Sequence, residues 1–303
     1  MTSDFLEIIE VSPRDGIQNE KTLLSTADKL HLIGLAVDAG LRRLEVTSFV
    51  NPARVPQMAD AAEVAAGLPR GRAQYIGLTL NARGFERAVA AGLDEANFVV
   101  VASDTFNRRN QGVATEDSIR AFAGIAASAP TGIRLGLTIG AAFGCPFEGE
   151  VPLARLMQVV ESCMAHAPFE LALADTIGVA TPRDVTERVG AVRRAFPDVP
   201  VRLHLHNTRN TGIANAWAGI EAGARSLDAS LGGVGGCPFA PRATGNIATE
   251  DLVYMLERSG VRTGVDLDKA IAAAEWLEQK LGKPVPGMVM KAGGFPSPAP
   301  APA

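Results

Sequence analysis

Cysteine is scarce in this chain. Only three cysteines occur in 303 residues, at positions 145, 163 and 237, so they cannot all pair, and they lie far apart in the sequence. Structural disulfides are typical of secreted proteins. We therefore expect a reducing compartment, and hence a cytoplasmic protein.

Long apolar runs and excess positive charge are also lacking. No stretch approaches the roughly 18–20 uncharged residues that would span a membrane. The N-terminus, MTSDFLEIIEVSPRDG, enters a strand-like segment within a few residues, which leaves no room for a signal or transit peptide. The formal net charge is −4, and nothing indicates a nucleic acid or an anionic membrane as partner.

The chain is instead rich in alternating short and long segments. With 47% hydrophobic and 20% charged residues, it suits a globular protein with a large core. Eight short strand-like runs are predicted at 6–11, 44–48, 75–80, 96–101, 134–139, 171–174, 201–206 and 227–230. Helix-like segments rich in Ala, Leu, Glu and Arg are predicted at 26–39, 82–91, 118–129, 152–165, 182–195 and 211–222.

The order of these segments predicts the fold. Eight β-then-α units with no break in composition favour a single α/β domain, a (β/α)₈ TIM barrel, over residues 1–290. A doubly wound sheet is the alternative, but the glycine-rich GGVGG follows the last strand rather than the first. Ser25, Thr115 and Thr181 are predicted helix caps. The Pro/Ala-rich tail at 291–303 is expected to be disordered.

Two of only four histidines lie one residue apart in the seventh strand, within LHLHN. Side chains two apart on a strand point to the same side, so His204 and His206 would face one site at the C-terminal end of a barrel. Asp15, at the end of the first strand, and Asn246, in ATGNIATED, would add a carboxylate and an amide oxygen. This donor set suits Mg²⁺ or Mn²⁺, with Co²⁺ or Zn²⁺ as alternatives. Otherwise the histidines are core or solvated residues and Asp15 a surface partner of Arg14.

Other strand ends carry groups that suit catalysis. Arg14 offers planar donors for an oxyanion, and Glu45, after the second strand, would orient other groups. Asp175 either caps the following segment or is a carboxylate at the rim. Cys237, in the flexible GVGGCPF, is a candidate acid or base, or else a small buried loop residue. Cys145 ranks lower, and Cys163 is expected to pack in a helix.

Six motifs together carry a resemblance to a known family. These are EVSPRDGIQNEK, EVTSFVNPARVPQMAD, GCPFEG, DTIGVATP, HLHN and GGVGGCPFAPRATGNIATEDLVYML. In order and in content they closely resemble the 3-hydroxy-3-methylglutaryl-CoA (HMG-CoA) lyases, from about residue 6 to 282. The resemblance implies a metal-dependent carbon–carbon lyase on a TIM barrel. Such an enzyme cleaves an acyl-CoA substrate to acetyl-CoA and acetoacetate in leucine catabolism.

The same resemblance implies roles for particular residues. Matching the family's metal ligands are Asp15, His204, His206 and Asn246. Four residues match its catalytic groups: Arg14 matches the arginine that stabilises the enolate, Cys237 matches the cysteine of the flexible loop, and Glu45 and Asp175 match active-site carboxylates. Supporting positions are Glu10, Gln18 and Glu250. A looser match assigns substrate or CoA contacts to Ser48, Arg108, Arg109 and Thr176.

One stretch departs from the family pattern. After the second histidine the lyases continue Asp-Thr-Tyr-Gly. This chain has HNTRNTG, with Asn207 for the acid and with Arg209 and Asn210 for the Tyr-Gly. Arg209 would then contact a substrate carboxylate or face solvent. A lyase for a related thioester such as citramalyl-CoA is therefore an alternative. More distant alternatives are a condensing enzyme and a non-catalytic metal- or CoA-ester-binding barrel. A homo-oligomer is also expected.

Overall fold

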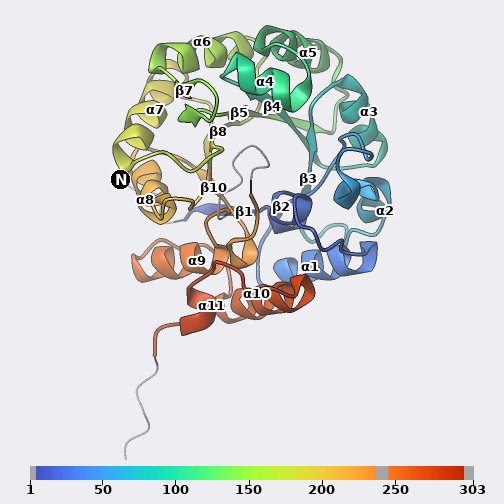
Figure 1. Ribbon diagram of the computed structural model, residues 1–303, viewed down its shortest axis with the longest axis vertical. Coiled ribbons are helices and arrows are strands. Elements are labelled where there is room, and N and C mark those ends of the chain that lie inside the picture. The colour runs from blue at the N-terminus through green and yellow to red at the C-terminus, as the bar shows by residue number, and fades with distance from the viewer. Residues whose placement is uncertain (1–4, 237–244, 297–303) are drawn as a thin grey trace, which may run out of the picture.

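The computed structural model describes residues 5–236 and 245–296, and it contains a closed barrel of eight parallel strands in the order β1-β10-β9-β8-β5-β4-β3-β2 (Figure 1). The barrel strands are β1 (Glu7–Glu10), β2 (Arg43–Ser48), β3 (Gln74–Thr79), β4 (Glu95–Val101), β5 (Arg134–Gly140), β8 (Leu171–Asp175), β9 (Val201–Leu205) and β10 (Ser226–Ala229). Each end lies within one residue of the prediction. The predicted (β/α)₈ TIM barrel is confirmed.

Helices surround the barrel on all sides (Figure 1). They are α1 (Thr26–Asp38), α2 (Ala61–Ala66), α3 (Ala82–Ala90), α4 (Asp104–Gln111), α5 (Thr115–Ser128), α6 (Leu153–Met164), α7 (Pro182–Ala195), α8 (Gly212–Glu221), α9 (Thr249–Arg258), α10 (Leu267–Leu281) and α11 (Val289–Ala292). Short turns η1 (Ser12–Gly16), η2 (Pro56–Met58) and η3 (Leu231–Gly233) and a hairpin of β6 (Gly144–Cys145) and β7 (Gly149–Glu150) complete the described chain. The sequence prediction omitted α2, α4, the last three helices and the hairpin. Helix α11 runs two residues past the predicted domain boundary.

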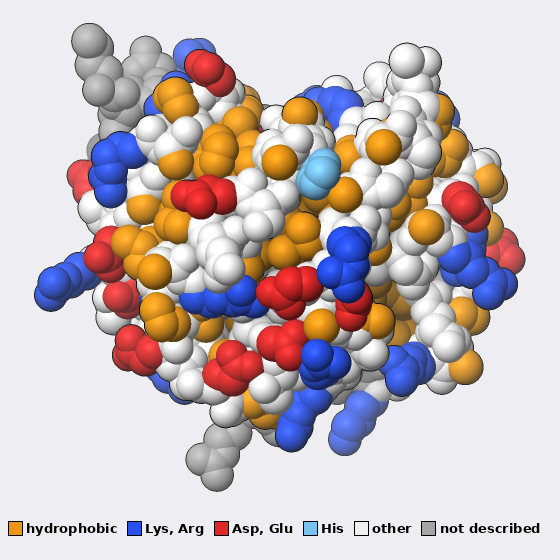
Figure 2. Space-filling model, turned by 90° about the horizontal axis from the view of Figure 1, so that it is seen from above, with side chains coloured by type: hydrophobic (Ala, Val, Ile, Leu, Met, Phe, Trp, Pro, Cys, Tyr) orange, Lys and Arg blue, Asp and Glu red, His pale blue; other side chains and the backbone are white. Residues whose placement is uncertain are grey.

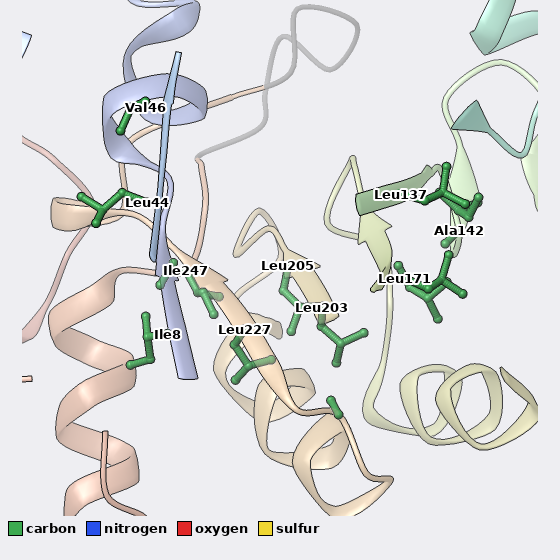
Figure 3. Close-up of a cluster of buried hydrophobic side chains, with 14 of the residues drawn as sticks. Ile8, Leu44, Val46, Leu137, Ala142, Leu171, Leu203, Leu205, Leu227 and Ile247 are labelled. Carbon is green, nitrogen blue, oxygen red and sulfur yellow. The ribbon is translucent and has the colours of Figure 1, made fainter. Parts of the chain in front are cut away.

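Alternation along the strands separates two environments. Leu44 and Val46 on β2, and Leu203 and Leu205 on β9, are buried in the apolar layer between strands and helices. Figure 3 shows such side chains from several strands. Because successive residues point to opposite faces, the intervening residues point into the barrel. This outer layer is the main hydrophobic core.

The inside of the barrel is mostly polar. Within the described part of the chain, Ile9, Val11 and Ile76 form a small buried apolar cluster separate from the main core. On the strands' inner faces, Arg43 binds Glu95 and Glu170, with NH2 2.7 Å from a carboxylate oxygen of each. A buried charge needs such partners, because transfer out of water otherwise costs several kcal/mol. The polar interior is therefore satisfied by ion pairs at its N-terminal end.

Two of the three predicted helix caps are confirmed. The Ser25 side chain accepts the backbone N–H of Asp28, and Thr181 accepts that of Asp184. Thr115 was predicted as a cap wrongly: it is the first residue of α5, and its hydroxyl donates to the Val101 carbonyl. The Asp117 carboxylate instead accepts the N–H of Ala114. The carboxylate of Asp117, the third residue of the helix, thus satisfies a backbone N–H at the start of α5.

The outer surface carries charge of both signs. On the face in Figure 2, acidic and basic side chains are interspersed with apolar ones. Among the described residues, no helix is both long enough and apolar enough to cross a membrane.

Cys163 is fully buried in α6, as predicted for a packing residue. Burial raises the pKa of its thiol to about 12.

Candidate active site

A cavity lies at the C-terminal ends of the strands, where β1 passes into η1 and β9 ends. It is lined by residues on or directly after all eight barrel strands. The polar residues lining it are Arg14, Asp15, Gln18, Asn19, Glu45, Asn97, Asn110, Thr138, Thr176, His204, His206 and Asp228. This is the end of the barrel at which TIM-barrel enzymes carry their active sites.

The two histidines face each other in this cavity. His204 is the fourth residue of β9, and His206 directly follows the strand. Their Nε2 atoms lie 3.1 Å apart, and these atoms are 3.8 and 3.9 Å from Asp15 Oδ2. The structure thus brings both histidines and Asp15 together in one cavity.

The possible ligand atoms of these three residues lie within 4.8 Å of one another. Nδ1 of His204 lies 2.9 Å from Asp228 Oδ2, and an ionised carboxylate only accepts hydrogen bonds, so Nδ1 carries a proton and, in the neutral ring, Nε2 is an acceptor. Burial and the neighbouring His204 lower the pKa of His206 to about 4, which keeps that ring neutral near pH 7. Two imidazole acceptors 3.1 Å apart repel each other unless a proton or a cation lies between them.

A divalent cation fits this arrangement. Adjacent ligands on an octahedral ion are about 3 Å apart when each lies about 2.1 Å from the metal. The three donor atoms lie 3.1, 3.8 and 3.9 Å from one another. Two histidines and one carboxylate on one side of an ion leave further positions open to substrate or water. Asp15, His204 and His206 are thus a candidate metal centre, by geometry and by donor type.

Asn246 lies beside this centre on the segment paired with His206. Its Nδ2 donates to Asp15 Oδ2 at 2.8 Å and to the Val234 carbonyl at 3.0 Å, while Oδ1 is buried with no hydrogen-bond partner. A buried amide oxygen without a partner is costly. Exchanging the two amide atoms by a half-turn would place the oxygen next to Asp15, where a cation would satisfy it.

Arg14 connects the metal candidates to β2. Its guanidinium contacts Glu45 and donates to Asp15 Oδ1 at 2.6 Å. Burial by itself would raise the pKa of Asp15. The charges of Arg14 and the two histidines lower it by more, so the pKa of Asp15 is well below the usual range. Glu45 was expected after the second strand, but it lies within β2, on the inner face. Asn97 donates to the other carboxylate oxygen of Glu45, at 3.3 Å. Glu45 therefore orients Arg14.

Glu10 and Glu250 lie outside the cavity and hold the turn η3 that follows β10. Oε1 of Glu10 accepts the N–H groups of Ser12 and Leu231, at 2.8 and 3.0 Å. Oε2 of Glu250 accepts the N–H of Gly232 at 3.1 Å. Burial raises the pKa of both carboxyls above the ordinary value. They connect η1 to the stem of the loop that leads to Cys237.

Asp175 acts as a cap rather than as part of the cavity lining. Its two oxygens accept the N–H groups of Val179 and Ala180, at 2.9 and 3.0 Å. Burial raises its pKa despite these bonds. The capping alternative therefore agrees with the geometry. Its neighbour Thr176 does line the cavity and accepts the N–H of Ala141.

The stem of the glycine loop is fixed on the N-terminal segment. Asn19 Nδ2 donates to the Gly236 carbonyl at 2.7 Å, and both residues line the cavity. Ser48 donates to Gln18 Oε1 at 3.0 Å, which orients another lining residue. Cys237 itself, at 237, lies outside the described residues. Cys145 is buried in β6, with its sulfur 2.9 Å from the hydroxyl of Ser103.

The two arginines expected near CoA have different surroundings. Arg108 is exposed and pairs with Asp104 one turn earlier in α4, at 2.7 Å. Arg109 packs over the Phe147 ring, 4.1 Å from its centre. With Arg54 it lines a second groove, which shares Gln18, Asn19 and Asn110 with the cavity. Of the pair, only Arg109 lines a groove continuous with the candidate site.

The segment that departs from the family pattern has a structural role. Asn207 Oδ1 accepts the N–H of Gly212 at 3.0 Å, at the start of α8. Arg209 NH1 donates to the carbonyls of Ile177 and Gly178, at 3.0 and 2.8 Å. Neither lines the cavity. Arg209 is exposed, which agrees with the expectation that it faces solvent, and it also links the loops after β8 and β9.

Sequence reasoning missed several cavity residues. Asp228, Asn97 and Thr138 all lie within strands, on inner faces. An acid at alternate spacing in SLDAS, inside an otherwise apolar strand, was the available signal for Asp228. Asn97 and Thr138 bond to each other, at 2.9 Å, across β4 and β5. That pairing depends on strand register, which the sequence does not display.

Comparison with known proteins places these residues in context. The HMGL-like family matches residues 5–277. The (R)-citramalyl-CoA lyase of Chloroflexus aurantiacus is 46% identical over 298 residues, 94% of this chain and 94% of that protein. The hydroxymethylglutaryl-CoA lyase of Bacillus subtilis is 40% identical over 281 residues, 92% of this chain and 94% of that protein. A solved HMG-CoA lyase from Acinetobacter baumannii, in complex with coenzyme A and 3-methylmalate, aligns with a TM-score of 0.94 at 40% identity, over 100% of this chain and 99% of that one.

Proposed function

The chain belongs to the HMGL-like family, and from this premise we propose that it is a carbon–carbon lyase that cleaves HMG-CoA to acetyl-CoA and acetoacetate. One observation carries the proposal. Asp15, His204 and His206 converge on one point beside Arg14, in a cavity at the C-terminal end of the barrel. That set suits the cleavage of a β-hydroxy thioester, which needs a polarised hydroxyl and a stabilised enolate.

We propose that the three residues hold a divalent ion, Mg²⁺ or Mn²⁺, with the Asn246 oxygen as a further ligand. When bound, such an ion supplies a Lewis acid that lowers the pKa of the substrate hydroxyl and fixes its orientation. The mixture of carboxylate, imidazole and amide donors supports Mg²⁺ or Mn²⁺, and no cysteine is among the described ligands.

In the proposed reaction a Cys237 thiolate takes the proton of the C3 hydroxyl, the C3–O bond becomes the carbonyl of acetoacetate, and the bond between C2 and C3 breaks. The electron pair remains on the thioester as an enolate. Arg14, held between Glu45 and Asp15, would donate to the enolate oxygen as charge develops there. Because Glu45 fixes the guanidinium beforehand, little reorganisation is needed at that moment.

A proton must then return to the enolate carbon to give acetyl-CoA. We assign this step to Cys237 rather than to Asp175. Both oxygens of Asp175 already accept backbone N–H groups, and its side chain does not line the cavity. Cys237 directly follows Gly236, which does line it. The glycines before it lack side chains, which lets the backbone there approach a ligand closely.

The CoA portion would extend along the groove that continues from the cavity. Arg54 and Arg109 line it, and arginine binds phosphate oxygens in a bidentate manner. Gln18, Ser48 and Thr176 would contact or orient the acyl part. Arg108 is a weaker candidate, because Asp104 already pairs with it.

A second substrate deserves a test of its own. The relative from Chloroflexus aurantiacus is named for (R)-citramalyl-CoA, whose acyl chain is one methylene shorter than that of HMG-CoA. The HNTRNTG segment also departs from the HMG-CoA lyase pattern. Cleavage of citramalyl-CoA would give acetyl-CoA and pyruvate.

The deciding experiment offers both thioesters to the purified protein with Mg²⁺ or Mn²⁺. Acetoacetate from HMG-CoA, with kcat/KM above that for citramalyl-CoA, supports the first proposal. Pyruvate as the main product would instead support citramalyl-CoA as the substrate. Acetyl-CoA release from neither, by a protein that binds Mn²⁺, would refute both. We also predict a cytoplasmic location, a homo-oligomer and a role in leucine catabolism. Light scattering of the purified protein after size-exclusion chromatography would measure the number of subunits.

A further inference from the structure

A chain of buried charged groups runs through the barrel behind the candidate metal centre. Asp228, on the inner face of β10, accepts from His204 Nδ1 at 2.9 Å through Oδ2. Its other oxygen, Oδ1, accepts from Nε of Arg202 on β9. Arg202 in turn lies 3.8 Å from Glu170, which binds Arg43 at the opposite end of the barrel. All of these side chains are almost fully buried.

Each oxygen of Asp228 therefore has one committed partner. The strand register produces this directly, because Asp228 is paired with His204 across β9 and β10, and Arg202 is two residues earlier on β9. An arginine keeps its protons in proteins, so Arg202 always requires an acceptor at Oδ1. Among the residues that the structure describes, the hydrogen-bond partner of Oδ2 is the ring nitrogen of His204.

We propose that Asp228, held by Arg202, is a positioning residue that fixes the tautomer and ring orientation of His204 so that Nε2 is presented to the metal. This rests on the proposed function, because it concerns a ligand of the proposed ion. Carboxylates that bind the far nitrogen of a metal-bound histidine typically strengthen metal binding 10- to 100-fold. Asp228 does not touch the donor centre itself: it acts through His204.

The isosteric change Asp228→Asn tests the idea, because an amide has only one oxygen. Arg202 and His204 would both require that oxygen, and Arg202 cannot give up its proton. The amide oxygen would therefore turn to Arg202, and the NH₂ group would face His204 Nδ1. His204 would then carry its proton on Nε2, the atom that has to bind the metal.

The first measurement uses the unaltered protein and needs no metal. Only four histidines occur in the chain, so ¹⁵N-histidine labelling gives a spectrum simple enough to assign with single His→Gln variants. Long-range ¹H–¹⁵N correlations report which ring nitrogen carries a proton. We expect His204 Nδ1 to be protonated in the metal-free and in the Mg²⁺-loaded protein. A bare Nδ1 in either state would overturn the proposal.

The second measurement compares Mn²⁺ affinity, by electron paramagnetic resonance, between wild type, Asp228→Asn and a matched control. The control is Glu170→Gln, the same acid-to-amide change in the same buried network, where Glu170 binds Arg43 and Ser226 but not His204. We expect Asp228→Asn to weaken Mn²⁺ binding 10- to 100-fold and to move the His204 proton to Nε2. Glu170→Gln should leave affinity within threefold, whatever it does to stability.

The outcomes separate this proposal from the proposed function. Equal loss of affinity in both variants would mean that the network acts only by stabilising the fold, and would overturn the inference. Unchanged affinity in Asp228→Asn would overturn it as well. If wild type binds Mn²⁺ but cleaves neither thioester, the substrate proposal fails and the role of Asp228 is still decided. If wild type binds no Mn²⁺, the metal proposal fails, and the proton position on His204 alone decides whether Asp228 sets its tautomer.

Discussion

Replacing Glu250 by glutamine should change how the stability of the protein depends on pH. This side chain on α9 is fully buried, and only Oε2 has a partner, the N–H of Gly232. Oε1 has none, and the backbone of Gly287 packs directly against it. Burial raises the pKa of the Glu250 carboxyl from 4.5 to about 8. The folded protein therefore keeps this carboxyl protonated near neutral pH.

The size of the effect follows from the two pKa values. Below pH 4.5 the carboxyl is protonated in both states and folding is not opposed by its ionisation. As the pH rises towards 8, the unfolded chain releases its proton and the folded chain does not, so stability falls by about 1.4 kcal/mol per pH unit. Over the whole range the loss amounts to about 5 kcal/mol. Glutamine resembles the protonated acid and cannot ionise.

Urea unfolding at pH 5, 6, 7 and 8 would measure this. We expect the free energy of unfolding of Glu250→Gln, relative to wild type, to increase steadily over this range, by about 4 kcal/mol in all. An exposed glutamate, in Glu221→Gln on α8, is the control and should follow wild type at every pH. Parallel curves for wild type and Glu250→Gln would refute the reasoning, because they would mean that Glu250 ionises at its ordinary pH in the folded protein.

Four further predictions concern the site and its frame. His206→Ala should abolish Mn²⁺ binding and lyase turnover together, and wild type stripped with a chelator should regain turnover when Mg²⁺ or Mn²⁺ is added back; turnover in the presence of excess chelator would contradict this. Arg14→Gln should lower kcat about 10²- to 10³-fold, as the loss of one oxyanion donor does, and steady-state kinetics would reveal a change confined to KM if the role is wrong. Arg209→Ala, which removes a link between loops, should change kcat/KM for HMG-CoA and for citramalyl-CoA by the same factor; a change in their ratio would instead make Arg209 a specificity residue. Thr181→Ala should cost about 1 kcal/mol in urea unfolding as a lost helix cap, whereas Thr186→Ala on the same helix, whose hydroxyl only donates to the Pro182 carbonyl, should cost less.

The strands and the closure of the barrel were predictable because they depend on local patterns. An apolar run of four to seven residues, bounded by glycine or by a capping residue, is visible in the chain without knowledge of its neighbours. The segments that escaped prediction are less periodic. Helix α4 is strongly polar, and α10 lies beyond the last βα unit, where it packs on α1.

The candidate site was predictable to the extent that its residues stand at strand ends. His204 and His206 were identified by the two-residue period of a strand, and Asp15 by its position after β1. Glu10 and Asp175 were also noticed, but Asp175 accepts backbone N–H groups, and Glu10 accepts backbone N–H groups and the Thr249 hydroxyl. Residue type alone did not separate a carboxylate that caps a loop from one that faces the cavity.

The amino-acid sequence by itself determined the eight βα units, the end of the barrel that carries the site and the residue types available there. Only the tertiary structure decided which of these groups meet. Asp228 reaches His204 because β9 and β10 are neighbours in a particular register, and Arg14 reaches Glu45 because β1 and β2 pair side by side. Hydrogen bonds and ion pairs form over about 3 Å, whereas the partners are 24 and 31 residues apart in the chain, so their pairing is fixed by packing rather than by local sequence.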